Sequence, residues 1–125
     1  MNSIRRFCSW LGRFRPKPLG DLLAIEFDDV GARVIVLDRL EPDWNQAFAW
    51  QDVLRVCFKD AGLYRSDVLF ITVVGRSKPV VVLMEARGAP VLIGELAKRN
   101  LFPEKVWRRA FGDTSGGTHC WPPEQ

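Results

Sequence analysis

Short apolar runs with strand-like spacing fill the chain from Leu22 to Glu85, and this spacing constrains the fold more than any other feature. Five runs follow one another, and each fits a period of two, which is typical of strands that bury one face. The last two runs are apolar on both faces. The residues expected to point inward are, run by run, Leu23, Ile25 and Phe27; Val34 and Val36; Leu54, Val56 and Phe58; Leu69, Ile71 and Val73; Val80, Val82 and Met84.

The connections between these runs are short. The turn at 28–31 places two acids before a glycine and predicts a hairpin between the first two strands. A second turn occupies residues 75–78, and Pro79 opens the fifth strand, where its missing N–H is tolerated. Because parallel strands need long crossovers, we expect an antiparallel sheet.

Helical spacing begins only after these strands. Pro90 suits the first turn of a helix that ends near Asn100, and Pro103 opens a second helix that ends at Gly112. A short segment at 118–121 returns to the sheet edge. The sequence therefore predicts an α+β domain in which a five- or six-stranded antiparallel sheet carries two C-terminal helices on one face.

Residues 1–18 form a basic amphipathic arm that precedes a single domain of residues 19–125. Ser3 can cap a short helix, and Pro16 and Pro18 end it and form an extended linker. The apolar stripe of this helix consists of Ile4, Phe7, Cys8, Leu11 and Phe14. We expect a short N-terminal amphipathic helix that is an appendage to the sheet.

The cysteines and the hydropathy bound the location of the protein. Cys8, Cys57 and Cys120 are odd in number and form no Cys-x-x-Cys pair, which indicates free thiols in a reducing compartment. No apolar stretch approaches the roughly 20 residues of a membrane span, and the N-terminus lacks the apolar core of a secretory signal. We therefore expect a cytoplasmic protein.

Residues that could carry catalysis are sparse. His119 is the only histidine, and its neighbour Cys120 would point to the opposite side of an extended segment. Glu26 and Asp28 share one face of the first strand, which suits paired acid–base carboxylates or, more simply, the outer face of a half-buried strand. No metal-ligand or nucleotide-binding motif is present. We expect no enzyme activity, no catalytic residues, no cofactor and no metal.

Charge is divided along the chain. Residues 21–67 carry a net charge of −5, whereas residues 1–18 carry +5 and residues 76–113 carry +4. Trp44 lies in the acidic part, and an exposed tryptophan within an acidic rim is typical of a protein-binding hot spot. The alternative is that Trp44 folds back onto the sheet. The candidate partner-binding residues are Glu26, Asp28, Glu41, Asp43, Trp44 and Asp52.

The basic arm offers a second candidate surface. It could contact an anionic membrane, or it could dock back on the domain and cover a sheet edge. Nucleic acid is not expected as a partner, because no basic and aromatic face recurs elsewhere. The membrane-contacting residues would be Arg5, Arg6, Trp10, Arg13 and Arg15.

Several short motifs carry a resemblance to known families. They are Ile25-Glu26-Phe27-Asp28-Asp29-Val30-Gly31, Phe48-Ala49-Trp50-Gln51-Asp52-Val53-Leu54-Arg55-Val56, Asp67-Val68-Leu69-Phe70 and the closing Cys120-Trp121. Over about residues 22–121 the pattern resembles small bacterial immunity-type proteins that accompany contact-dependent or polymorphic toxins. The order of strands before helix also resembles bacterial pleckstrin-homology-like domains, which usually end in one helix rather than two.

Each resemblance implies a function. The first implies an immunity protein that neutralises a toxin domain by direct contact, with the acidic residues and Trp44 facing a basic toxin surface. The second implies a peripheral membrane or lipid-head-group binding module that uses the basic arm together with Arg76 and Lys78. The motifs themselves are structural and carry no catalytic residue.

Overall fold

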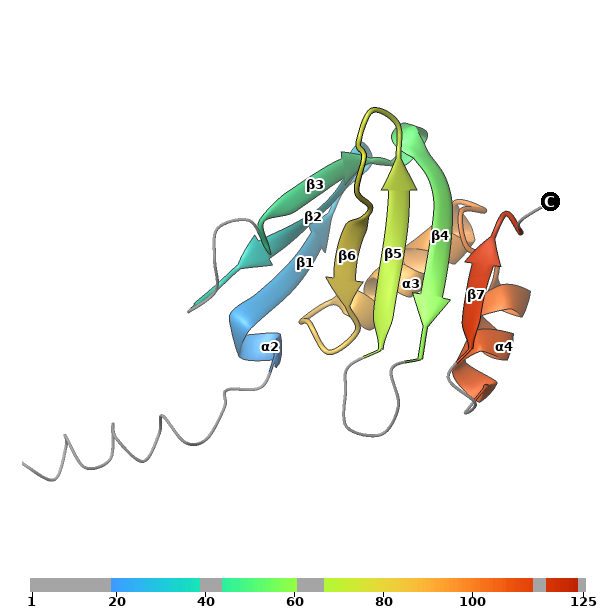
Figure 1. Cartoon of the computed structure of the whole chain (residues 1–125). Coiled ribbons are helices and arrows are strands. Elements are labelled where there is room, and N and C mark those ends of the chain that lie inside the picture. The colour runs from blue at the N-terminus through green and yellow to red at the C-terminus, as the bar shows by residue number, and fades with distance from the viewer. Residues whose placement is uncertain (1–18, 39–43, 61–66, 114–116, 124–125) are drawn as a thin grey trace, which may run out of the picture.

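The fold comes from a computed structural model, which describes residues 19–38, 44–60, 67–113 and 117–123 (Figure 1). Its elements are α2 (Leu19–Leu22), β1 (Leu23–Phe27), β2 (Gly31–Val36), β3 (Gln46–Ala49), the 3-10 turn η2 (Trp50–Asp52), β4 (Val53–Lys59), β5 (Val68–Val73), β6 (Val80–Leu83), α3 (Ala89–Lys98), α4 (Glu104–Gly112) and β7 (Thr118–Trp121). All strand pairs between these elements are antiparallel. The predicted α+β class is confirmed.

The strands form two sheets, so the prediction of one five- or six-stranded sheet is wrong. One sheet has the order β1-β2-β3 and the other the order β6-β5-β4-β7. The chain changes sheet at η2, where the Trp50 N–H donates to the Val30 carbonyl and the Asp52 carbonyl accepts from the Val74 N–H, both at 2.9 Å. The sequence pattern missed β3 because its four residues include only one large apolar side chain, Phe48.

A glutamine side chain joins the two sheets. The Gln46 amide of β3 donates to the Val81 carbonyl of β6 and accepts from the Val81 N–H, each at 3.3 Å. The side chain thereby supplies the donor and acceptor that a neighbouring strand would offer. As a result, β3 and β6 lie side by side although they belong to different sheets.

The inward faces of the strands follow the predicted alternation with one local exception. The core contains buried side chains from both sheets and from α3 and α4: Leu23, Ile25, Val34, Phe48, Trp50, Val56, Phe58, Leu69, Ile71, Val73, Val80, Val82, Leu92, Ile93, Leu96, Phe102 and Ala110. Leu54 was expected inside but is 55% exposed. The β4–β5 register shifts between Val53 and Arg55, and this irregularity turns Leu54 outward.

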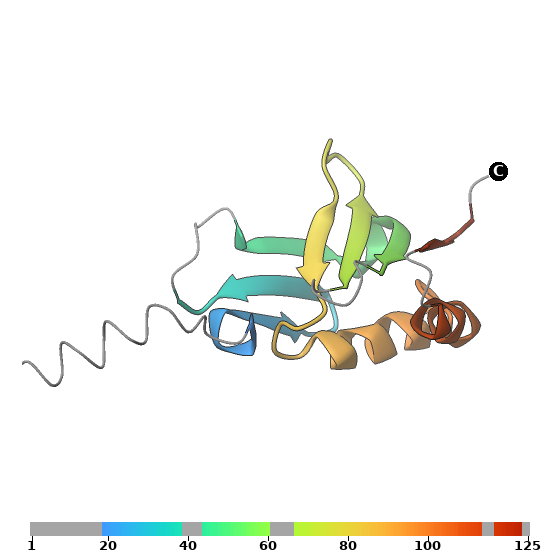
Figure 2. The same cartoon turned by 60° about the horizontal axis from the view of Figure 1, so that its bottom comes forward.

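The two predicted C-terminal helices are confirmed, and both lie on the same side of the sheets (Figure 2). α3 packs against β1, and α4 packs against β7 and β4. Asn100 adopts a left-handed conformation with φ 59° just after α3, and the N–H groups of Leu101 and Phe102 then donate to the Leu96 carbonyl. Asparagine tolerates this conformation, so it ends the helix as expected.

The expectation of free thiols is wrong for two of the three cysteines. β7 pairs with β4, which places Cys57 opposite Cys120 with their Cα atoms 4.0 Å apart, and the two sulfurs form a disulfide. Sequence spacing hid this pair because 63 residues separate the cysteines. The bond removes the thiol argument on which the cytoplasmic expectation partly rested.

The predicted N-terminal helix of residues 1–18 lies outside the described residues. α2 begins at Leu19 and leads directly into β1. Within the ranges that the structure describes, no helix is both long and apolar enough to span a membrane.

Replacing Phe58 by alanine tests the assignment of the β4 inner face. Phe58 is 2% exposed and packs edge-on against Phe111, so Phe58→Ala should lower the free energy of unfolding by about 3–5 kcal/mol. The neighbouring Lys59 is exposed on the other face of the strand, and Lys59→Ala should change the free energy of unfolding by less than about 0.5 kcal/mol. Urea unfolding of both variants measures the difference, and equal effects would contradict the register.

The disulfide predicts a specific thiol count. Titration of the denatured, unreduced chain should find one free thiol, and titration after reduction should find three, the total in the sequence. Because the bond closes a long loop, Cys57→Ala with Cys120→Ala should cost roughly 2–4 kcal/mol of unfolding free energy. Three thiols before reduction would show that the bond does not form.

Candidate functional site

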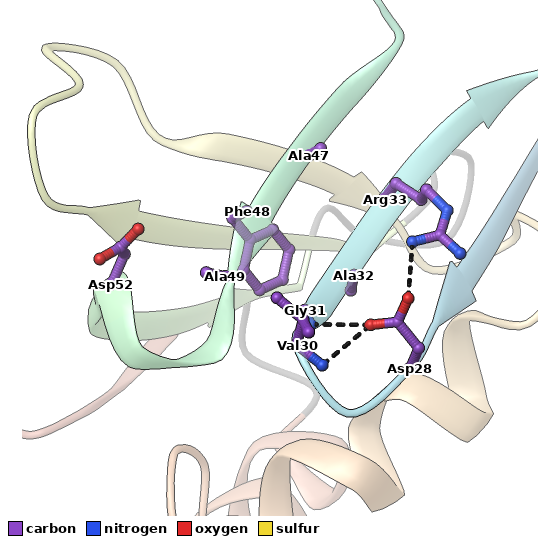
Figure 3. Close-up of a pocket in the computed structure, with 9 residues that line it drawn as sticks. All are labelled: Asp28, Val30, Gly31, Ala32, Arg33, Ala47, Phe48, Ala49 and Asp52. Atoms are coloured by element: carbon purple, nitrogen blue, oxygen red, sulfur yellow. Dashed lines mark hydrogen bonds and ion pairs between the residues drawn. The ribbon is translucent and has the colours of Figure 1, made fainter.

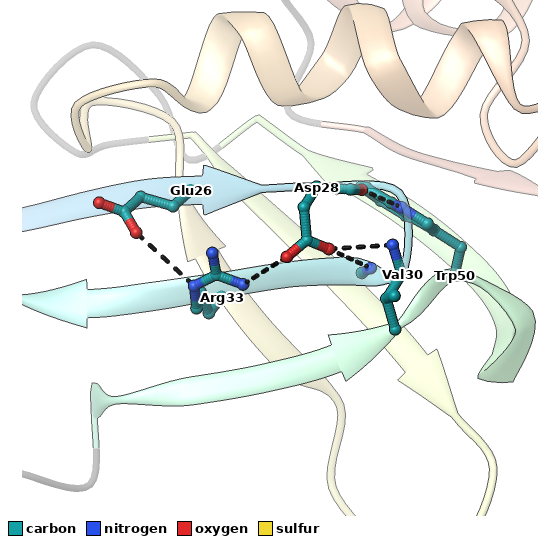
Figure 4. A network of polar contacts seen from close by, with 6 residues as sticks. Glu26, Asp28, Val30, Arg33 and Trp50 are labelled. Atoms are coloured by element: carbon teal, nitrogen blue, oxygen red, sulfur yellow. Dashed lines mark hydrogen bonds and ion pairs between the residues drawn. The ribbon is translucent and has the colours of Figure 1, made fainter.

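The β1–β2 turn is built around the carboxylate of Asp28 (Figure 4). Its Oδ1 accepts hydrogen bonds from the N–H groups of Val30 at 2.9 Å and Gly31 at 3.1 Å. Its Oδ2 accepts from Arg33 Nη1 at 3.3 Å. The Val30 and Gly31 donors, with a smaller contribution from Arg33, lower the pKa of Asp28 below its usual range, because all three stabilise the charged form.

Arg33 connects the two carboxylates that the sequence placed on one face. Its Nε lies 3.6 Å from Glu26 Oε2, while its Nη1 contacts Asp28 (Figure 4). The predicted shared face is therefore correct. Since a guanidinium bridges the pair, the arrangement is that of an ion-pair network on the outer surface of a strand pair rather than of an acid–base pair.

The turn is also fixed from the core side by Trp50. The indole Nε1 donates to the Asp28 carbonyl at 2.8 Å, and the ring packs edge-on against Phe27 and Phe48. The guanidinium of Arg99 lies 4.6 Å from the indole centroid. The backbone of the turn is thus held on both sides, by a carboxylate outside and by an aromatic donor inside.

A shallow hollow of about 400 Å³ lies beside the turn on the outer face of the three-stranded sheet (Figure 3). Its floor is low because Gly31, Ala47 and Ala49 have small side chains. Gly31 is required there, since a Cβ at this position would lie 2.0 Å from the Phe48 carbonyl oxygen. Asp28 borders one side of the hollow, and Asp52 of η2 borders the other.

Val30 stands between this hollow and a second one. The second hollow is lined by Asp29, Val30, Trp50, Gln51, Arg99 and Leu101. At 72%, Val30 is the most exposed large apolar residue in the described part of the chain. We call Glu26, Asp28, Asp29, Val30 and Asp52 the turn surface. Sequence reasoning missed Val30, although a β-branched apolar residue between acids and glycine in a tight turn is itself an unusual signal.

The other candidate residues fall in different places. Trp44 is partly exposed and packs against the core, which is the folded-back alternative of the two that the sequence left open. Glu41 and Asp43 lie outside the described residues. The same is true of the arm residues Arg5, Arg6, Trp10, Arg13 and Arg15, so the membrane alternative stays a prediction.

The remaining chemical candidates have structural partners. His119 Nε2 lies 2.8 Å from Asp113 Oδ2, at the contact between β7 and the end of α4. Cys120 is held in the disulfide and offers no thiolate in that state. Among residues 19–38, 44–60, 67–113 and 117–123, no three histidine, cysteine or acidic side chains gather in a way that could hold a metal ion.

Comparison of the chain with protein-family models, with curated proteins and with solved structures finds no match. The resemblances drawn from short motifs therefore stay expectations.

The Asp28 carboxylate gives the turn a pH-dependent stability. Asp28→Ala should destabilise the protein, and Asp28→Asn should do so less, because an amide oxygen can still accept from Val30 and Gly31. The native pKa is lowered, so the stabilisation is full above about pH 4 and is lost as pH falls through the native pKa. Urea unfolding at about pH 7 and about pH 3 should show that the difference in unfolding free energy between wild type and Asp28→Asn is smaller at the lower pH.

Asp29→Asn is the matched control for this experiment. The Asp29 carboxylate neighbours Asp28 in the same turn, but it makes no hydrogen bond to a described residue. Its substitution should change the unfolding free energy little at either pH. A gap for Asp28→Asn that stays constant between the two pH values would contradict the role assigned to the Asp28 charge.

Proposed function

We propose that this protein is a non-enzymatic binding module whose turn surface contacts a basic protein, and that this partner is a bacterial toxin domain. In this proposal it is an immunity protein of a contact-dependent or polymorphic toxin system. The observation that carries the proposal is Val30, which is 72% exposed at the tip of a fixed turn and has Asp28 and Asp29 directly before it.

The composition of the turn surface supports a basic partner. It has four acids and one apolar residue, and Arg33 offsets only part of the negative charge. Acidic surfaces attract basic ones over several ångströms and raise the rate of encounter, while a central apolar side chain supplies buried contact. Val30 would be that contact, a role that the sequence had assigned to Trp44.

The turn surface is also rigid for its size. The bonds from Val30 and Gly31 to the Asp28 carboxylate, and from Trp50 to the Asp28 carbonyl, fix the backbone before any partner arrives. A surface ordered in advance loses little conformational entropy on binding. This favours a role in recognition over a role as a passive loop.

The motif resemblance and the charge division favour a toxin as the partner. The motifs that carry the resemblance to immunity-type proteins include the Asp28–Gly31 turn and the Trp50–Asp52 segment, and these two segments hold four of the five residues of the turn surface. Toxins that act on nucleic acid are often basic, which complements the net charge of −5 over residues 21–67. The positive total charge comes from other parts of the chain.

Coexpression tests the proposal. The full chain, expressed together with the product of the neighbouring gene, should copurify with it and should restore growth of cells that produce it. If neither copurification nor rescue occurs, the immunity proposal is wrong. Sedimentation with anionic vesicles in place of the partner would instead support the membrane alternative.

Substitution of Val30 tests the surface itself. Val30→Ser should weaken binding to the captured partner by roughly ten- to thirtyfold, about 1.4–2 kcal/mol, because it removes the apolar contact. The matched control is Val91→Ser on α3, where the valine is 62% exposed and lines neither of the two hollows beside the turn. Titration calorimetry should show an unchanged affinity for the control, and equal losses for both variants would rule out the turn surface.

A further inference from the structure

We propose that the outer face of the four-stranded sheet is a docking surface for the N-terminal arm, residues 1–18. The arm would cover a patch of apolar side chains that the described elements leave open. This inference is independent of the proposed function, because the patch lies on a different sheet from the turn surface.

The patch follows from the strand register. Val56 and Phe58 point inward on β4, so Cys57 between them points outward. Across the sheet, Cys57 is opposite Cys120 on β7 and Phe70 on β5, and Phe70 is opposite Val81 on β6. With Val68, two residues before Phe70 on the same face, these residues form what we call the outer patch, and all of its members are partly exposed.

No described helix or strand covers the outer patch. In Figures 1 and 2 both α3 and α4 lie on the opposite side of the four-stranded sheet. An antiparallel sheet with one solvated face normally carries polar side chains on that face. Here Arg55, Lys59, Thr72 and Thr118 lie on that face, but a disulfide, a phenylalanine and a valine form an apolar row between them across all four strands. We take this row as the part of the face that another segment contacts.

The arm fits this surface in chemistry and in length. Its sequence predicts a helix with one apolar stripe, which runs from Ile4 to Phe14. Eleven helical residues extend about 16 Å, and four strands span about 14 Å from first to last. One apolar stripe of this length would therefore cross the sheet once.

The described chain begins beside the segment that follows β6, at the end of the four-stranded sheet where β5 starts. Gly20 of α2 lies beside the Glu85 carbonyl, from which a Cβ would be 3.8 Å away, and Asp21 pairs with Arg87 at 3.4 Å. The neighbouring Met84 N–H donates to the Asp67 carbonyl, and Asp67 directly precedes Val68 of the patch. The linker at 15–18 would span roughly 12 Å if extended.

Attachment to the same chain favours the arm over other occupants. A segment held by a short linker has an effective concentration in the millimolar range, so even weak apolar contact keeps it docked. The proposal also gives the stripe a position in which its phenylalanines and leucine are not exposed to water. Membrane contact would then require the arm to leave the sheet.

A spin label on the arm tests the proposal in the full chain. The Ser9→Cys substitution in a Cys8→Ala background places one free thiol on the polar side of the predicted helix, with the disulfide kept oxidised. The label should broaden the amide signals of Val68, Phe70 and Val81. It should leave those of Arg33 and Ala47, on the outer face of the other sheet, sharp.

Variants of the arm and of the patch complete the test. Leu11→Ser and Phe70→Ser should each abolish the broadening, whereas Arg6→Ser on the polar side of the arm and Thr72→Ser on the same face of β5 should keep it. If circular dichroism shows that Phe70→Ser does not fold, Leu11→Ser carries the test.

No broadening of the patch amides in the labelled parent would overturn the proposal. Broadening in a mixture of spin-labelled chains and isotope-labelled chains would also overturn it and would identify a second copy as the occupant.

Discussion

The indole of Trp50 is the contact on which the arrangement of the rest depends. Its N–H donates to the Asp28 carbonyl, its ring packs edge-on against Phe27 and Phe48, and Arg99 stacks over it from the end of α3. One side chain thus touches the first hairpin, the third strand and the helical half of the domain. Because Trp50 begins η2, the same residue marks the place where the chain leaves one sheet and enters the other.

The change of sheet at η2 separates the turn surface from the outer patch. A single continuous sheet would place β3 beside β4, whereas the observed break places β3 beside β6, to which the Gln46 side chain hydrogen-bonds it. The break brings Asp52 next to the hollow of the three-stranded sheet, beside the turn that carries Val30. The proposed recognition by this turn and the proposed coverage of the outer patch therefore use different sheets and need not compete.

The sequence predicted those features that depend on local pattern. The strand alternation placed residues such as Val56 and Ile71 inside, and the proline, asparagine and glycine positions located both C-terminal helices. The features that it missed depend on contacts distant in sequence. The disulfide needs β7 to return to β4, the outward turn of Leu54 needs a register shift, and β3 has too few apolar residues to show a period. Of the site, the shared face of Glu26 and Asp28 was predictable, but the exposure of Val30 was not, because it depends on how the turn projects.

The bond between Cys57 and Cys120 turns the second half of the chain into a covalent ring that contains β5, β6, α3 and α4. A single cut by a protease in any loop of that ring would open it without separating the two pieces. A pulling force on the C-terminal end would pass through the sulfurs into the central strand β4 and would bypass the helices. The tail of this protein is therefore mechanically attached to the middle of its sheet, and the helices between them are relieved of tension from that end.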